Sequence, residues 1–124
     1  MSDPAPKCKC AFIKNLVLLL VLCLASALVW YNLNERALRQ KENRALELMQ
    51  EGQNKAAIQQ FLELKQDRPK AADQTRLNAY LADCYVNLAE DPSIPLEESL
   101  KYYRKVLEFD PGKVPALIRE RLTP

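Results

Sequence analysis

Histidine is absent from the sequence, and glycine occurs at only two of its 124 positions. Without histidine the chain lacks the most common general base and the most common metal ligand. Gly52 and Gly112 stand far apart, so no glycine-rich phosphate loop is present. We therefore expect no enzyme activity, with no catalytic residue, no metal site, no cofactor and no small-molecule substrate.

Long runs of one charge sign are also missing. Three lysines and one aspartate in residues 1–31 account for the whole formal net charge of +2, so residues 32–124 are neutral, with both signs mixed. A neutral surface of mixed charge does not attract a phosphate backbone. We therefore expect no nucleic-acid partner.

The four cysteines do not have the spacing of a disulfide framework. Cys8 and Cys10 precede the apolar segment described below, Cys23 lies inside it, and Cys84 lies far beyond it. Because a membrane would separate most of these pairs, we interpret the cysteines as free thiols. Two alternatives stay open for Cys8 and Cys10: lipid attachment beside a membrane, and a two-thiol metal site without further ligands.

The longest apolar stretch covers residues 16–31, LVLLLVLCLASALVWY, and contains no charged residue. With its flanks it reaches about 20 residues, which is enough for a helix to cross a hydrocarbon layer of about 30 Å. Lys14 can extend its amine to the headgroups, and Trp30 and Tyr31 belong to the types that favour the membrane interface. We predict a single transmembrane helix at residues 12–33, after a flexible basic tail at residues 1–11.

The sequence also resembles a cleavable secretory signal at one point, Ala25-Ser26-Ala27. The apolar run continues beyond Ala27, where a cleaved signal would turn polar, and this favours a retained anchor. Three basic residues precede the span and four follow it closely, so charge gives little orientation bias. A short basic tail before a first helix usually stays inside, so we expect a cytoplasmic N-terminus and a helical domain on the opposite side.

No segment alternates apolar and polar residues as a half-buried strand does, so we predict an all-α domain over residues 34–124. The anchor helix lacks a glycine or proline until Gly52 and is expected to continue to that point. Further helices are expected at residues 54–66, 73–89, 96–109 and 114–122, because proline-containing segments separate them.

Within this domain, small and bulky residues recur in a fixed order that ends at a proline. Residues 38–71 supply Ala45, Leu48, Gly52, Ala57, Phe61 and Pro69. Residues 75–113 supply Leu81, Ala82, Tyr85, Ser99, Tyr103, Val106 and Pro111. This order resembles the tetratricopeptide repeat, an antiparallel helix pair of about 34 residues. Lys41 departs from the family pattern, which has an aromatic residue there, and about five extra residues surround Pro92 to Pro95.

The resemblance implies two helix pairs and a short capping helix at residues 114–122. It also implies that the positions that match the repeat pattern serve packing, since small side chains let helices approach and bulky ones fill the space between them. Such repeats usually bind peptides or proteins in a groove lined by their first helices. Here that groove face would carry Arg39, Glu42, Leu46, Met49, Gln50, Arg76, Ala79, Asp83, Val86 and Asn87.

One branch of the family binds terminal carboxylates through lysine and asparagine, but Glu42 and Leu46 occupy those places here, so that activity is not expected. Two hypotheses of function follow. In the first, the chain is a membrane-anchored adaptor, scaffold or assembly factor that recruits another protein to the bilayer. In the second, it is an accessory subunit of a larger membrane complex, with its transmembrane helix packed against other subunits.

Overall fold

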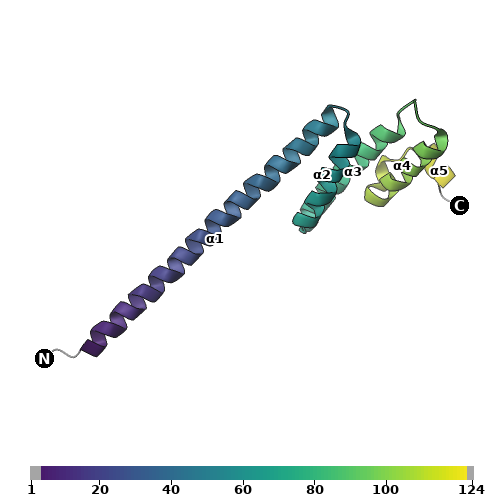
Figure 1. The fold of residues 1–124 in the computed structure, drawn as a ribbon. Coiled ribbons are helices and arrows are strands. Elements are labelled where there is room, and N and C mark those ends of the chain that lie inside the picture. The colour runs from purple at the N-terminus through teal and green to yellow at the C-terminus, as the bar shows by residue number, and fades with distance from the viewer. Residues whose placement is uncertain (1–3, 123–124) are drawn as a thin grey trace. The chain divides into compact units, whose positions relative to one another are not determined.

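The computed structural model describes the backbone of residues 4–122 and the side chains of residues 9–122. These residues form helices and no strand, which confirms the all-α prediction. The helices are α1 (Pro4–Gln50), α2 (Asn54–Asp67), α3 (Ala71–Ala89), α4 (Leu96–Phe109), the short 3-10 helix η1 (Pro111–Lys113) and α5 (Ala116–Leu122). Figure 1 labels α1 to α5.

The predicted flexible tail at residues 1–11 is wrong from Pro4 onward, because α1 begins there. Pro4 and Pro6 both fall in the first helical turn. The N–H groups of that turn have no partner inside a helix, so a proline that lacks this group is tolerated. The part of the predicted tail before Pro4 lies outside the described residues.

By their contacts, the residues divide into two units, 1–37 and 38–124. In the first unit the apolar side chains of α1 are exposed, from 47% at Leu16 to 69% at Trp30. An 18-residue window of this helix is long and apolar enough to cross a membrane, a test that signal sequences near an N-terminus also pass.

The second unit is built around α3, which contributes to two hydrophobic clusters. The first cluster joins α3 to α2 and to the part of α1 after residue 37, and its members are Leu38, Ala45, Leu48, Ala57, Ile58, Phe61, Leu64, Leu77, Leu81 and Cys84. The second cluster joins α3 to α4 and to the C-terminal segment, and its members are Ala82, Ala89, Tyr103, Val106 and Val114. Leu77 and Leu81 in the first cluster and Ala82 in the second have no exposed surface, so both sides of α3 are packed.

Polar side chains fix the ends of these helices. The side-chain amide of Gln74 donates to the carbonyl oxygens of Lys65 and Arg68, at 2.7 and 2.8 Å, and so satisfies the C-terminal carbonyls of α2. The hydroxyl of Ser99 donates to the carbonyl oxygen of Ala89 at 2.6 Å and ties the start of α4 to the end of α3.

The predicted capping helix at residues 114–122 begins two residues later, at Ala116. Val114 has an extended backbone, with φ −83° and ψ 126°. A residue before proline is driven out of the helical region, so Pro115 sets this boundary. The segment before it forms η1.

Candidate functional site

The predicted groove face is held together by an ion-pair cluster between α1 and α3. The guanidinium of Arg76 donates to Glu42 at 2.7 and 3.4 Å and to Asp73 at 2.9 Å. The Glu42 side chain is 13% exposed and the Arg76 side chain 39%, so this contact is partly shielded from solvent. Hydrogen bonding to Glu42, above all, raises the pKa of Arg76. The cluster joins α1 to α3 through Glu42 and Arg76, which are 34 positions apart in sequence.

A second ionic contact lies further along α3. The amine of Lys113 in η1 donates to Asp83 at 2.5 Å and to the carbonyl oxygen of Ala79 at 3.1 Å. Ala79 and Asp83, both predicted to line the groove, therefore contact Lys113 of η1. The same lysine fixes the C-terminal segment against α3.

The apolar residues of the predicted face are half-buried. Leu46 and Met49 pack against the first hydrophobic cluster, and Val86 packs against the second. The amide of Asn87 donates to the side chain of Asn54 at 3.3 Å, so Asn87 contacts the start of α2. Arg39 and Gln50 are exposed on α1. The ten predicted residues thus include members of ion pairs, inter-helix contacts and solvated positions.

Most of the residues predicted to serve packing are buried in the core of the second unit. Eight of them are buried: Ala45, Leu48, Ala57, Phe61, Leu81, Ala82, Tyr103 and Val106. Tyr85 is half-buried and stacks on Phe109, with ring centroids 5.9 Å apart. Gly52 turns the chain between α1 and α2 at φ +82°, a backbone conformation that residues with a side chain rarely adopt. Pro69 and Pro111 are exposed next to helix ends.

Burial also determines the chemistry of Cys84. Its side chain has no exposed surface, and desolvation raises the pKa of its thiol to about 12. Burial likewise raises the pKa values of Tyr85 and Tyr103. A thiol held in this neutral form is a poor nucleophile. Among the described residues, no three acidic or cysteine side chains gather to hold a metal ion.

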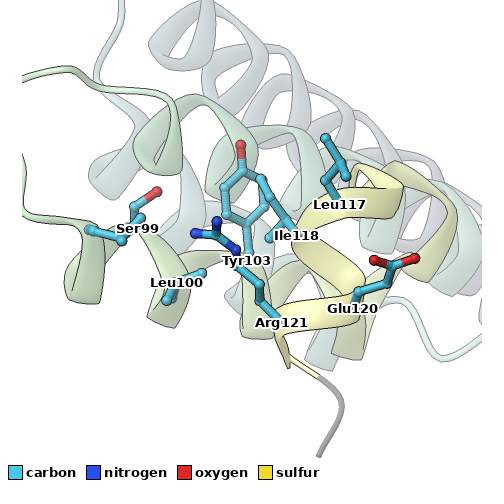
Figure 2. Close-up of a pocket in the computed structure, with 8 residues that line it drawn as sticks. Ser99, Leu100, Tyr103, Leu117, Ile118, Glu120 and Arg121 are labelled. Atoms are coloured by element: carbon cyan, nitrogen blue, oxygen red, sulfur yellow. The ribbon is translucent and has the colours of Figure 1, made fainter.

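A pocket of about 550 Å³ opens between α4 and α5. Its lining, most of which is labelled in Figure 2, consists of Leu96, Ser99, Leu100, Tyr103, Leu117, Ile118, Glu120 and Arg121. Figure 2 shows Arg121 reaching from α5 toward Tyr103 of α4, while Glu120 points away from that ring. Leu96 and Leu117 are 62% and 79% exposed, so apolar side chains form part of the mouth of the pocket.

This α4–α5 pocket was not predicted from the sequence. A signal was present, because Leu96, Leu100 and Tyr103 follow one another at intervals of four and three on α4. Of the three, Tyr103 was predicted to serve packing, as apolar residues at such spacing usually do, and Leu96 was given no role. The pocket depends on how far α5 stands from α4, and no residue spacing encodes that distance.

The predicted interface residues lie in the first unit. Trp30 and Tyr31 are 69% and 51% exposed, and Lys14 is exposed two residues before the apolar run. Their order along α1 places a cation at one end of the apolar run and two aromatic rings at the other. This arrangement suits the two edges of a hydrocarbon layer.

Comparison of the chain with protein-family models, with curated proteins and with solved structures gives no match.

Proposed function

We propose that the chain is a single-pass membrane protein whose second unit, residues 38–124, binds another protein. The observation that carries this proposal is the contrast between the two units. Apolar side chains from Phe12 to Leu33 are exposed on α1, whereas the second unit buries its apolar residues in two clusters. Exposing a helix of this kind to water would be costly, and a bilayer removes that cost.

We further propose that the second unit is a tetratricopeptide-like array of two helix pairs. In this scheme α2 follows the last part of α1 through Gly52, and α4 follows α3 through a proline-containing loop. The scheme is supported by the fully buried Ala45 and Ala57, which let two helices approach, and by Phe61, which fills the space beside them. Clusters shared between successive helices are what such arrays require.

Partner binding is assigned to the face of α1 and α3 that carries Leu46, Met49 and Val86. Half-buried apolar side chains beside charged ones are typical of protein contacts. The Arg76–Glu42 pair at 2.7 Å would hold the two helices at a fixed separation, so a partner would meet a preformed surface.

An accessory subunit of a membrane complex is the second candidate. It is favoured by a shallow hollow on α1 lined by Leu22, Ala25, Ser26, Val29, Trp30 and Leu33. Small residues such as Ala25 and Ser26 let a second transmembrane helix approach closely.

One experiment separates these two functions. The full chain is purified from detergent extracts in three forms: unchanged, with residues 12–33 replaced by an unrelated apolar helix, and with Met49→Asp. An adaptor keeps its co-purifying protein when the helix is exchanged and loses it with Met49→Asp. A subunit shows the opposite pattern. If both variants keep the partner, both assignments are contradicted.

A further inference from the structure

The second unit leaves one part of its surface apolar. Among the described residues outside α1, two large apolar side chains are classed as exposed, Leu96 at 62% and Leu117 at 79%. Both line the α4–α5 pocket, although they are 21 positions apart in sequence. Exposed apolar residues that gather on one site point to an interaction surface, whereas scattered ones do not.

We propose that this pocket is the contact surface of a homodimer, in which Leu117 of each copy enters the α4–α5 pocket of the other. A pocket of about 550 Å³ has room for a leucine side chain. Because Leu117 projects from the rim of the pocket that would receive its counterpart, a two-fold axis between the copies brings both leucines into place together. Such reciprocity is the property of isologous interfaces.

Charge on the two rims favours a second copy over a strongly acidic or basic partner. On α5 the pocket is lined by Glu120 and Arg121, one of each sign. On α4 the exposed residues next to Leu96 and Leu100 are Glu97 and Lys101, again one of each sign. A rim with both signs on each side can match itself after a two-fold rotation, but it has no excess charge to attract a charged peptide.

The contact would be small. Stable dimers usually bury about 1,600 Å² in total, and one pocket per copy gives less than that. We therefore expect a weak, concentration-dependent dimer. The inference does not depend on the membrane assignment or on the partner proposed for the α1–α3 face, since neither surface includes α4 or α5.

Photo-crosslinking of the full chain tests the proposal. A benzophenone amino acid replaces Leu117, and the matched control carries it at the exposed Gln59 of α2. Equal amounts of unlabelled and nitrogen-15-labelled chain are mixed before irradiation. The expected product has twice the 14.2 kDa chain mass, combines both isotopes, and joins position 117 to an α4 peptide that contains Leu96 or Leu100. The control yields no such product.

A second measurement uses substitution instead of a reactive group. Leu117→Lys should weaken self-association at least about tenfold in a titration followed by energy transfer, whereas Gln59→Lys should leave it unchanged. Because Leu117 is 79% exposed, the fold should survive, and an unchanged far-UV spectrum checks this. Crosslinking of position 117 to a different protein, to a lipid, only to its own α4, or to nothing would overturn the proposal, as would unaltered association of Leu117→Lys.

Discussion

At the scale of single residues, Phe61 shows where the stability of the second unit resides. Its ring is fully buried and stacks on Tyr80, with centroids 5.3 Å apart. We expect Phe61→Ala to lower the free energy of unfolding by about 3–5 kcal/mol, because it removes buried surface and leaves a cavity. Leu117→Ala is the matched control and should change it by less than about 0.5 kcal/mol. Urea unfolding of the full chain in detergent, followed by circular dichroism, measures both, and equal effects would contradict the assigned core.

Cys84 gives a prediction about alkaline pH. Its thiol pKa is raised from 9.0 to about 12 by burial, so the folded state keeps the proton after the unfolded chain has lost it. The stability that this difference provides is complete below pH 9 and is lost as the pH rises toward 12. Each pH unit above 9 should remove about 1.4 kcal/mol.

The measurement compares the unfolding free energies of the unchanged chain and of Cys84→Ala between pH 8 and pH 10.5. Cys84→Ala starts lower, because it removes buried volume, but its stability should fall less steeply with pH. Parallel slopes for the two proteins would show that Cys84 ionises normally in the folded state.

At the scale of helices, the turn between α1 and α2 depends on one glycine. Gly52 has φ +82°, and a Cβ built on it meets no atom within 4 Å. A substitution there is therefore disfavoured by backbone conformation and not by a clash. Gly52→Ala should cost about 1 kcal/mol of stability, whereas Gly112→Ala, at an ordinary φ, should be close to neutral. Thermal unfolding distinguishes them, and equal losses would assign the cost of Gly52→Ala to something other than φ.

Most helix positions could be predicted from sequence, because local signals set their ends. The ends of α4 at Leu96 and Phe109 were predicted without error, since prolines stand on both sides. The start of α1 at Pro4 was missed, because Pro4 and Pro6 gave no helix signal in the sequence, although proline is tolerated in a first turn.

The candidate sites were harder to predict, because side-chain contacts depend on tertiary placement. Asp83 was predicted to lie on the groove face, and the structure adds a contact that the sequence did not reveal, because Lys113 donates to Asp83 at 2.5 Å after the chain returns along η1. Neither residue type nor sequence spacing predicts a contact between residues 30 positions apart. The α4–α5 pocket was missed for the same reason, since it depends on the placement of α5 beside α4.

At the scale of the whole molecule, the proposed membrane anchor raises the question of which side holds the N-terminus and which side holds residues 38–124. Cys10 is exposed at the start of the apolar helix, and Gln59 is exposed in the second unit. Cys84 is buried, so a thiol reagent that cannot cross membranes will not reach it in the folded protein. If the N-terminus is cytoplasmic and the helical domain lies on the opposite side, as expected from the sequence, intact cells should show labelling of Gln59→Cys and none of Cys10, as read from the labelled peptides by mass spectrometry.

Opening the membrane with detergent should then expose Cys10 as well, which controls for its reactivity. The assignment of residues 12–33 as the anchor has its own control, Leu20→Arg with Leu24→Arg. Two charges at the centre of a span cost about 2.5–3.5 kcal/mol each on insertion scales, so this variant should become extractable by alkaline carbonate while the unchanged chain stays with the membrane. Labelling of Cys10 but not Gln59→Cys in intact cells would show the opposite orientation and leave the anchor assignment intact. Extraction of the unchanged chain by carbonate would contradict the assignment of residues 12–33 as a membrane anchor.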